Sequence, residues 1–489
     1  MVENVKIEKV PTLEDYEAVA HLAPSVRELR DEATHVVPQL KGRTLWMINS
    51  TARGGGVAEM LPSMLQLLRD LGISTQWAVI ESEDPAFFSI TKRLHNLIHG
   101  EGDPALSAED RSVYEAVNRR NAEALEGRIK PGDILAVHDP QPMALAAMLK
   151  EKLEIPTVWR CHIGLDQENA ATRAAWGFLE PYAAAYDHAI FSAPEYIPPF
   201  LTDRSTIIHP AINPLSDKNR DLHLRRLVQI LSNSALVSSP GPMVSTPFHD
   251  QVQRFQGDGH YWPANMWDDI GLLTRPIVTQ VSRWDRLKGF VPLLEAFAHM
   301  KYKIYQRGGA QGWENRRRLD LVRLVLAGPD PASIQDDPEG QEVVAELEAA
   351  YLELDPILQD DVALITLPMR SAEQNALIVN ALQRASTLVV QNSLREGFGL
   401  TVTEAMWKRV PILTNSAACG PRQQVRNGLD GQLIEDPSDV EELANTLESM
   451  LSEAVARDSW GESAQRRVHQ NFLIFSQVRA WIHLLAGVV

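Results

Sequence analysis

Short apolar runs alternate with amphipathic stretches of helical period along most of this chain, and this alternation limits the fold more than any other feature. Strands separated by helices of about 10–15 residues predict parallel sheets with right-handed crossovers. The alternation fails once, between residues 217 and 271. Two such arrays predict an α/β protein of two Rossmann-like domains facing each other across a cleft; one continuous large sheet is the alternative. The predicted strands are 44–50, 76–80, 133–139, 156–163, 188–193 and 205–212, then 276–284, 321–328, 361–368, 387–393 and 410–415.

The same pattern sets the expected domain boundaries. Residues 1–40 are polar and mildly helical, and are expected to form an N-terminal extension. The two Rossmann-like domains are expected at 41–215 and 272–462. Residues 216–271, rich in Ser, Pro and Gly, are typical of a linker or an insertion. The tail, 463–489, is expected to be a helix that returns to the first domain.

Charge and cysteine content exclude several classes of protein. With 47 Lys and Arg against 64 Asp and Glu, the formal net charge is −17, which argues against a surface made for nucleic acid or anionic lipid. A local basic pocket is still compatible with it. The two cysteines, Cys161 and Cys419, cannot provide a disulfide framework or a zinc knuckle. No stretch approaches about 18 apolar residues, so we expect a cytoplasmic protein without a signal peptide or membrane span.

Ligands of open α/β domains bind where the strands end, so the residues after each strand are the candidates for a site. In the first array the strand 44–50 is followed by three glycines at 54–56, which would let a ligand approach bare backbone. Polar clusters follow two later strands, at 138–142 and 160–166. Their histidines could be structural or could recognise sugar hydroxyls. We favour the second over zinc, because no third ligand has a diagnostic spacing.

In the second array, a pair of basic residues follows the end of one strand. Arg283 and Lys288 follow the strand 276–284 and stand five positions apart in a turn, so they can converge on one anion. Arginine offers a planar fork and lysine a compact charge, a combination that suits a diphosphate. Taken alone, such a pair is more often part of a solvated surface turn.

The exit of the strand 387–393 is more informative. Gly397 and Gly399 frame a strand-to-helix turn, where backbone N–H groups and the helix dipole favour an anion. Glu396 precedes the turn and Glu404 lies in the helix. Carboxylates accept hydrogen bonds from hydroxyls, so the two fit a sugar on one side of the anion and a ribose on the other. The N–H groups would come from Phe398, Gly399, Leu400 and Thr401.

At these residues the sequence resembles a known family. Glu396 and Glu404 are similar to the paired-glutamate signature of retaining nucleotide-sugar glycosyltransferases with the GT-B fold. Over residues 49–407, a series of motifs looks like the trehalose glycosyltransferring synthases of glycosyltransferase family 4. These motifs are NSTARGGGVAEML, HDPQP, WRCHIGLD, APEYIPP, INPLSDKN, QVSRWDRLKG and REGFGLTVTEAMW.

The resemblance implies a reaction and its participants. The family transfers the glucosyl group of a nucleoside-diphosphate glucose (NDP-glucose) to glucose and forms α,α-trehalose reversibly. NDP-glucose would be a co-substrate, with no cofactor and no metal required. The expected partners are NDP-glucose and glucose or trehalose, with no nucleic acid and no membrane, and with a homodimer as the candidate assembly. The first domain would bind the acceptor and the second domain the donor.

The resemblance also implies roles for individual residues. Arg283 and Lys288 would bind the donor diphosphate in place of Mg²⁺, Glu396 the glucosyl hydroxyls and Glu404 the ribose. His162 would contact the donor glucose, and the leaving phosphate itself would take the acceptor proton. The expected catalytic set is therefore His162, Arg283, Lys288 and Glu396. The other expected positions are Gly397, Phe398, Gly399, Leu400 and Thr401 on the donor, and Gly55, Gly56, Asp139, Gln141, Arg160 and Asp166 in an acceptor or phosphate loop.

Two segments depart from the family pattern, and three alternatives stay open. Residues 233–270 look like an insertion, and Cys419 stands where a glycine pair is usual. One alternative is a trehalose phosphorylase, in which Arg283 and Lys288 bind inorganic phosphate and Glu404 has no ribose to hold. Another is a transferase with a different polyol or sugar acceptor. The third is a regulator that binds a sugar nucleotide without turnover.

Overall fold

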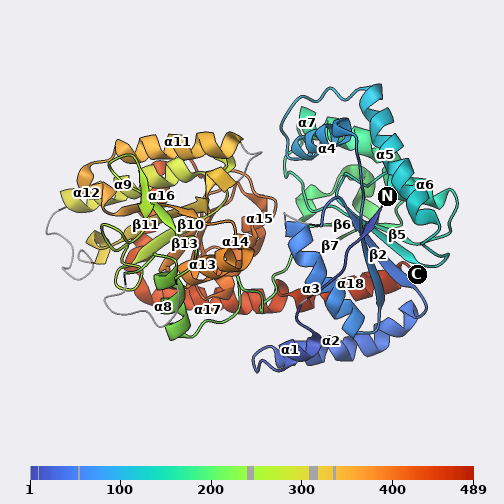
Figure 1. Cartoon of the computed structure of the whole chain (residues 1–489), viewed down its shortest axis with the longest axis horizontal. Helices are drawn as coiled ribbons and strands as arrows, with labels where there is room; N and C mark the ends of the chain where they lie inside the picture. Colours follow the sequence, from blue (N-terminus) through green and yellow to red (C-terminus); the bar gives the residue numbers. More distant parts are fainter. Residues whose placement is uncertain (1, 9, 53–55, 239–246, 308–317, 334–337) are drawn as a thin grey trace. The chain divides into compact units, whose positions relative to one another are not determined.

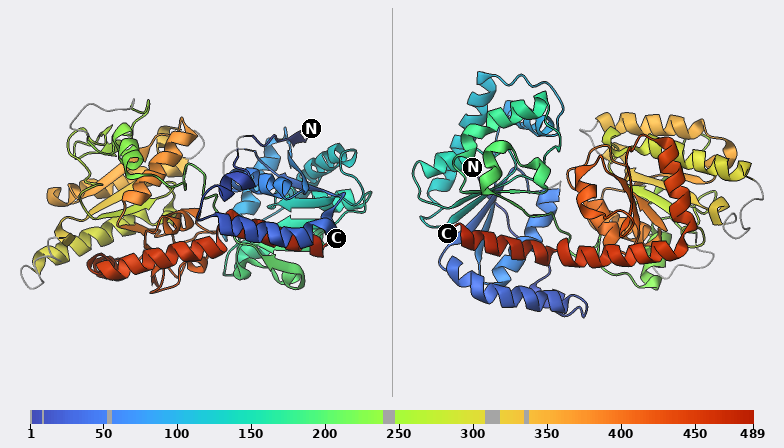
Figure 2. Two further views of the ribbon diagram at one scale, coloured as in Figure 1. Left: turned by 90° about the horizontal axis from the view of Figure 1, so that it is seen from below. Right: turned by 180° about the vertical axis from the view of Figure 1, so that it is seen from behind.

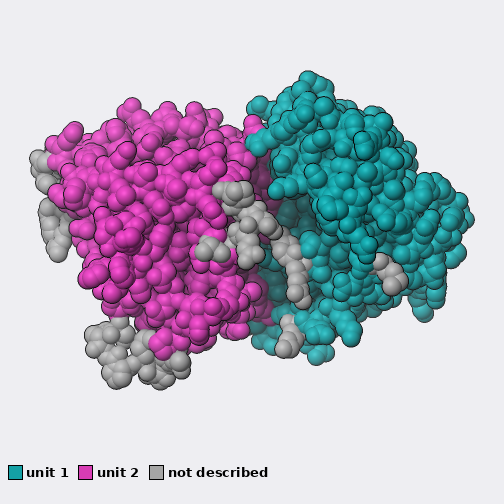
Figure 3. Space-filling model, turned by 45° about the horizontal axis from the view of Figure 1, so that its top comes forward, with its two compact units in different colours: residues 1–213, 471–489 teal, residues 214–470 magenta. Residues whose placement is uncertain are grey.

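The computed structural model describes residues 2–8, 10–52, 56–238, 247–307, 318–333 and 338–489. The chain divides into two compact units, which Figure 3 shows in different colours. Unit 1 consists of residues 1–213 and 471–489, and unit 2 of residues 214–470. Each unit contains its own sheet, so the alternative of one continuous sheet is wrong.

Unit 1 is built on a mostly parallel sheet. Among the described residues it has seven strands in the order β1-β3-β2-β4-β5-β6-β7. Every neighbouring pair is parallel except β1 with β3. The predicted α/β architecture is thus confirmed, with one short antiparallel strand added at the edge. The strands are β1 (Glu3–Asn4), β2 (Thr44–Asn49), β3 (Ser74–Val79), β4 (Ile134–His138), β5 (Thr157–Arg160), β6 (His188–Phe191) and β7 (Ser205–Ile207).

Helices cover this sheet, and the two ends of the chain pack together within unit 1. Helix α18 packs against α2 and α3, as the views in Figure 2 also show. Tyr16 meets Phe475 edge to face, with ring centroids 5.1 Å apart. The helices of unit 1 are α1 (Leu13–Glu17), α2 (Ala23–Val36), α3 (Gly56–Asp70), α4 (Pro85–Ile98), α5 (Ala108–Glu126), α6 (Leu145–Lys150), α7 (Ala170–Ala183) and α18 (Ile474–Gly487), with 3-10 helices η1 (Val37–Leu40), η2 (Pro194–Tyr196) and η3 (Pro199–Arg204).

Unit 2 has a larger mixed sheet. Its described strands number eight, in the order β15-β14-β13-β10-β11-β12-β8-β9. The first six are parallel, whereas β8 pairs antiparallel with both β12 and β9. The strands are β8 (Gln253–Phe255), β9 (Tyr261–Pro263), β10 (Ile277–Val281), β11 (Arg323–Pro329), β12 (Val362–Leu367), β13 (Leu388–Val390), β14 (Ile412–Asn415) and β15 (Gly431–Ile434).

Helices flank this sheet on both sides in Figure 1. They are α8 (Leu224–Asn233), α9 (Phe290–Gln306), α11 (Pro338–Leu352), α12 (Pro356–Gln359), α13 (Ala372–Ala385), α14 (Leu400–Trp407), α15 (Cys419–Gln424), α16 (Val440–Ser452) and α17 (Ala454–Asn471), with 3-10 helices η4 (Arg286–Lys288) and η5 (Pro331–Ser333).

Residues 216–271, expected as a linker or insertion, supply regular structure to unit 2. They contain α8 and the strands β8 and β9, which extend the sheet beyond β12. Arg254 in β8 is buried, and its Nη2 donates to the carbonyl of Val362. Strands of three residues are too short to produce a readable alternation, so the sequence pattern fails there. The stretch 239–246 lies outside the described residues.

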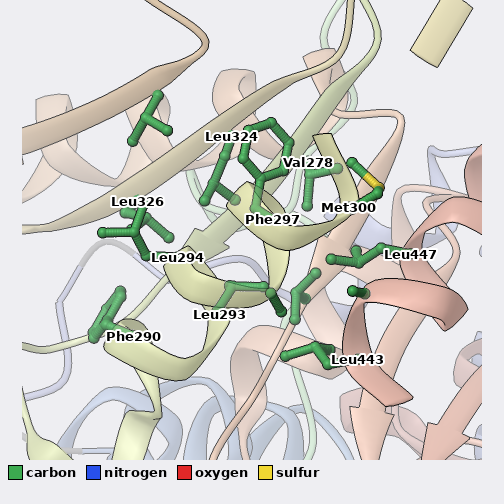
Figure 4. Close-up of a cluster of buried hydrophobic side chains, with 14 of the residues drawn as sticks. Val278, Phe290, Leu293, Leu294, Phe297, Met300, Leu324, Leu326, Leu443 and Leu447 are labelled. Carbon is green, nitrogen blue, oxygen red and sulfur yellow. The ribbon is translucent and has the colours of Figure 1, made fainter. Parts of the chain in front are cut away.

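The core of unit 2 explains why α9 and α16 form beside the sheet. Apolar side chains of α9 recur at helical spacing and pack onto β10 and β11 on one side and α16 on the other (Figure 4). Burying such side chains is the main favourable term in folding. The cluster includes Val278, Phe290, Leu293, Leu294, Phe297, Met300, Leu324, Leu326, Leu443 and Leu447.

A helix that crosses a membrane must be long and predominantly apolar, and this holds for no helix among the described residues.

Candidate active site

Two turns of unit 2 bring a lysine and a glutamate into contact. Lys288 ends η4, which follows β10, and Glu396 follows β13. Because β10 and β13 are neighbouring parallel strands, their carboxyl ends lie at the same edge of the sheet. The Nζ atom of Lys288 lies 2.6 Å from Oε2 of Glu396, and the two side chains are 12% and 18% exposed. The structure thus joins two of the predicted donor residues in one partly buried ion pair.

Arg283 stands on the same turn as Lys288, but it is not locked in place. Its side chain is 72% exposed, and its Nη2 lies 3.9 Å from Oδ2 of Asp285. Asp285 itself caps η4 by accepting a hydrogen bond from the N–H of Leu287 at 2.8 Å. An ion pair this exposed contributes little to stability. The guanidinium is therefore displayed to solvent beside a lysine that is already oriented.

The turn between Glu396 and α14 depends on glycine backbone. Gly399 is the N-cap of α14 and has a φ of 80°, in the left-handed region. Gly420 in α15 comes so close that a Cβ on it would lie 2.3 Å from the Cα of Phe398. Its N–H donates to the carbonyl of Glu396 at 3.2 Å. Among the described side chains none caps α14, so Leu400 and Thr401 begin the helix in a form that suits an anion.

Cys419, the expected departure from a glycine pair, lies beside this contact. It begins α15 and is buried, while the glycine that the close approach requires is Gly420. The structure therefore accommodates a side chain at position 419, and Gly420 keeps the close approach between α15 and the turn at Phe398.

Glu404 lies one helical turn beyond Leu400 and is almost buried. Its Oε1 lies 3.8 Å from Nζ of Lys218, and the side chains of Glu404 and Lys218 are 8% and 31% exposed. Lys218 belongs to the first residues of unit 2, which lie against α13 because the amide of Asn380 donates to the carbonyls of Asp217 and Arg220, each at 2.9 Å. The carboxylate thus faces a cation supplied by a distant part of the sequence.

A second lysine supports the same helix from inside. The Nζ of Lys408 donates to Oε1 of Gln383 at 2.8 Å, to the carbonyl of Glu404 at 3.0 Å and to Oδ1 of Asn219 at 3.2 Å. Burial lowers the pKa of Lys408 to about 7, and the nearby Glu404 carboxylate opposes that shift. Lys408 therefore ties α14, α13 and the start of unit 2 together.

In unit 1, Asp139 links the ends of two adjacent strands. Its backbone has a φ of 63°, unusual for a residue with a side chain. Its N–H donates to the carbonyl of Arg160 at 2.8 Å, and its Oδ1 accepts from the N–H of His162 at 2.8 Å. Burial raises the pKa of Asp139 to about 6, against the opposing effects of the His162 N–H and of Arg160. Strained backbone of this kind is concentrated at functional sites.

His162 pairs with a second histidine. Its Nε2 lies 3.1 Å from Nδ1 of His138, and the rings stack with centroids 5.4 Å apart. Nε2 of His138 lies 3.1 Å from Sδ of Met47, and Trp481 of α18 stacks beyond it. Burial, together with the charge of Arg160, lowers the pKa of His138 to about 3 and that of His162 well below the ordinary value. Both imidazoles are therefore neutral at physiological pH.

Arg160 is a buried cation beside this pair. It is 1% exposed, and its Nη2 donates to Oγ of Ser192 at 3.2 Å. No described group accepts a hydrogen bond from its Nη1. Burial lowers the pKa of Arg160 to about 10, and the carboxylate of Asp139 opposes that shift.

The structure brings His162, Asp139 and Arg160 together in unit 1, and Lys288 and Glu396 in unit 2. Three other predicted positions of unit 1 lie elsewhere in that unit. Gln141 is tied to α5 only through its carbonyl, which accepts from Asn118 at 3.2 Å. Asp166 is partly exposed, and Gly56 is the first residue of α3. Gly55 lies outside the described residues.

Several supporting residues were not predicted as part of a site. Lys218 lies in the motif INPLSDKN, but neither it nor Lys408 was assigned a role, because a lysine in a polar stretch or on a helix is usually solvated. Gln280 and Asn392 could have been found from the sequence, because each is an amide within or just after an apolar strand, and the structure shows both to be buried. Such a residue must have hydrogen-bond partners, and these lie where strands end. His138 stands in the same kind of position at the end of β4.

Within the described part of the chain, no group of three or more His, Cys, Asp or Glu side chains is arranged to hold a metal ion.

The sequence matches two family models, one in each unit. Residues 47–198 match "Trehalose synthase, N-terminal domain", and residues 269–467 match "Glycosyl transferases group 1". The chain is 34% identical to the trehalose synthase of Pyrococcus horikoshii over 97% of this chain and 95% of that protein. The trehalose synthase of Rubrobacter xylanophilus is 32% identical over 97% of this chain and 96% of its own length. The chain belongs to the trehalose synthase family. It is a glycosyltransferase, as the resemblance implied.

More distant relatives include phosphorylases. The trehalose phosphorylase of Pleurotus pulmonarius is 23% identical over 98% of this chain, which corresponds to 61% of that protein. The trehalose synthases match this chain more closely and over nearly their whole length.

Solved structures confirm the GT-B fold of this family member. The α,α-trehalose 6-phosphate synthase of Burkholderia multivorans superposes with a TM-score of 0.62 at 19% identity, over 91% of this chain and 97% of that one. An α,α-trehalose-phosphate synthase (UDP-forming) of Burkholderia xenovorans, in complex with glucose-6-phosphate, has a TM-score of 0.63 at 15% identity, over 91% and 100%. A third, from E. coli and bound with UDP-2-fluoro glucose, has a TM-score of 0.64 at 15% identity, over 91% and 99%.

The close approach of Gly420 to Phe398 generates a first prediction. We expect Gly420→Ala to push the Glu396 turn away from α15, because the new Cβ has no room. Overpacking of this kind costs about 1–3 kcal/mol of stability, and displacing the turn should lower glycosyl transfer by on the order of a hundredfold. Denaturant unfolding and initial rates measure the two effects. The matched control is Gly177→Ala in α7, where a Cβ meets open space, and full activity of Gly420→Ala would contradict the prediction.

The histidine pair generates a second prediction. We expect both rings, of His138 and His162, to keep the NMR chemical shifts of a neutral imidazole from pH 8 down to pH 5. The variants His138→Gln and His162→Gln assign the two sets of resonances. Their pKa values lie below the value of about 6.5 in unfolded chains, so the unfolded state takes up protons first and stability falls as the pH drops below about 6.5. The raised pKa of Asp139 acts in the opposite sense between about pH 4 and pH 6. A midpoint near 6.5 for either ring would contradict the prediction.

Proposed function

We propose that this protein transfers the glucosyl unit of NDP-glucose to glucose with retention of configuration, and so forms α,α-trehalose reversibly. The relatives named trehalose synthase support trehalose as the sugar product. A nucleotide-sugar donor is supported by the fold shared with a structure bound with UDP-2-fluoro glucose.

The observation that carries this proposal is the Lys288–Glu396 pair with Arg283 on the same turn. Lys288 is oriented by the carboxylate at 2.6 Å, and Arg283 is displayed to solvent. A glycine-framed helix start follows Glu396 directly. Cations and the N–H groups of a helix start at one strand edge suit a dianion, and a carboxylate beside them can accept hydrogen bonds from sugar hydroxyls.

The mechanism follows from where charge develops. Breaking the bond between glucose and phosphate puts negative charge on the leaving diphosphate and positive charge on the sugar. Arg283, Lys288 and the first N–H groups of α14 would stabilise the diphosphate. Glu396 would hold the sugar hydroxyls and stay close to the developing positive charge. In this proposal the leaving phosphate takes the acceptor proton on the same face, and no carboxylate attacks the sugar.

The neutral state of His162 fits a role in sugar recognition. A neutral imidazole offers one donor and one acceptor, the pattern that a sugar hydroxyl matches. Its ring Nε2 faces Nδ1 of His138, and the backbone N–H of His162 donates to Oδ1 of Asp139. We propose that His162 contacts the glucose of the donor, while Asp139 and Arg160 support the loop that carries it.

A trehalose phosphorylase is the second candidate, because relatives with that name align along almost the whole chain. The position of Glu404 speaks against it. At about 1.5 Å of rise per residue, Glu404 lies about 6 Å along the helix from Leu400. A carboxylate near a bare phosphate adds repulsion, whereas a nucleoside diphosphate offers ribose hydroxyls at that distance.

The third prediction tests the diphosphate cations. We expect Arg283→Ala and Lys288→Ala each to lower turnover on the order of 10²–10³-fold, because each removes charge from the leaving group. Both variants should keep the native fold by circular dichroism. The matched control is Arg286→Ala, in the same turn, whose guanidinium instead faces Glu342 and Glu346 at 3.2 and 2.6 Å.

Two outcomes would contradict the diphosphate assignment. One is near-native turnover of both variants with NDP-glucose. The other is an activity that is lost on chelation and restored by Mg²⁺, because the proposal assigns that charge to Arg283 and Lys288.

The fourth prediction separates the two glutamates and the two candidate reactions. We expect Glu404→Gln to weaken calorimetric binding of UDP or ADP roughly ten- to a hundredfold, because it loses charged hydrogen bonds to the ribose. Glu396→Gln should mainly lower the chemical rate. Glu373→Gln, on the exposed first turn of α13, is the control. Unchanged affinity in Glu404→Gln would eliminate the ribose role and favour the phosphorylase, which the sugar phosphate formed from trehalose and phosphate would then identify.

A further inference from the structure

We infer that Gln280 and Asn392 are positioning residues that place Lys288 against Glu396. This inference rests on the proposed donor role of that pair. Gln280 is 0% exposed and Asn392 1% exposed, so neither touches a substrate. Their effect on the reaction runs through the two turns that they join.

Gln280 spans the ends of two strands with one side chain. It is the penultimate residue of β10, and its Oε1 accepts from the N–H of Asn392 at 2.9 Å. Its Nε2 donates to the carbonyl of Lys288 at 2.7 Å. The orientation of the amide is fixed, because one partner is a backbone donor and the other a backbone acceptor. Gln280 therefore holds the backbone of Lys288 directly.

Asn392 holds the next carbonyl of the same turn. Its Nδ2 donates to the carbonyl of Gly289 at 3.1 Å and to that of Pro437 at 2.9 Å. Gly289 has a φ of 60°, and a Cβ there would lie 2.2 Å from the carbonyl oxygen of Asn392. A further bond runs from the N–H of Leu394 to the carbonyl of Leu287 at 2.8 Å. The carbonyls of Leu287 and Gly289 are thus bonded directly to the segment that leads to Glu396, and the carbonyl of Lys288 is joined to it through Gln280.

This arrangement reduces the freedom of a flexible side chain. A lysine has four rotatable bonds, and its ammonium reaches a defined place only if the backbone is fixed. The carbonyls of Lys288 and Gly289 are held, and the Nζ of Lys288 lies 2.6 Å from Oε2 of Glu396. An apolar side chain of the same size would fill the space of Gln280 but would remove the partner of two backbone groups, the N–H of Asn392 and the carbonyl of Lys288. The two hydrogen bonds of Gln280 to different turns identify it as a clamp.

A double-mutant cycle tests the clamp. The probes are UDP and ADP, and their affinity is measured by calorimetry for the full chain. We expect Gln280→Met, of similar length but without donor or acceptor, to weaken binding roughly ten- to a hundredfold. In the background of Lys288→Ala the same change should weaken binding less than about threefold, because Gln280 acts through Lys288. The KM for glucose should not change.

Thr279→Val is the matched control. Thr279 precedes Gln280 in β10, so its side chain points to the opposite face of the sheet, where its Oγ1 accepts from Ser386 at 2.7 Å. The control removes a buried hydrogen bond from the same strand, so it should lower the melting temperature but leave the affinity for UDP and ADP unchanged.

The outcomes separate this inference from the proposed function. Equal weakening by Gln280→Met in both backgrounds, or none in either, would overturn the positioning role. If Gln280→Met does not fold, Gln280→Glu replaces it, since it keeps the acceptor for Asn392 and loses the donor to Lys288. Binding of UDP and ADP by Lys288→Ala at wild-type strength would instead contradict the donor site itself.

Discussion

The ion pair between Lys288 and Glu396 is the interaction on which the proposed binding of the donor diphosphate to unit 2 depends. At 2.6 Å and with little exposure, the pair has lost much of its hydration, and its attraction must offset that cost. The carboxylate directs the lysine side chain, and the lysine offsets the negative charge of Glu396 beside the proposed anion site. A diphosphate that contacts the ammonium gains from a cation that is already in place. This is preorganisation in the sense that the charges need not rearrange when the leaving group forms.

The pair is held by backbone that two glycines allow to come close. Gly289 leaves room for the carbonyl of Asn392, and Gly420 leaves room for Phe398. Both approaches occur at the carboxyl edge of the parallel strands, where the loops of a Rossmann-like unit converge. A side chain at either position would separate a turn from its neighbour. Strand ends and close backbone contacts therefore fix the positions of the two turns. The long side chains add the charged groups, and the most exposed of these is the guanidinium of Arg283.

Much of this could be predicted from the sequence, and the failures have physical causes. Apolar strands followed by glycines or charges revealed the two arrays, and the strand-exit rule selected Arg283, Lys288 and Glu396. The strands β8, β9 and β15 were missed because their residues, QRF, YWP and GQLI, do not form an aliphatic run, whereas the equally short β13 reads LVV. Lys218 was missed because its approach to Glu404 depends on how a segment far away in sequence folds against α13. The clamp by Gln280 is a matter of hydrogen-bond geometry, which composition and spacing do not encode.

The surroundings of Glu404 give the strongest physical reason to favour a nucleotide donor. Burying a carboxylate is costly unless charge or hydrogen bonds compensate it. Lys218 lies 3.8 Å from it, and Lys408 holds its backbone carbonyl from below. A site that bound inorganic phosphate alone would gain nothing from a buried negative charge one helical turn away, since like charges repel. In the proposed function a nucleoside diphosphate would reverse that balance, because its ribose hydroxyls would donate to the carboxylate while its phosphates stay at the helix start. The ribose would then add hydrogen bonds to a carboxylate that Lys218 already faces.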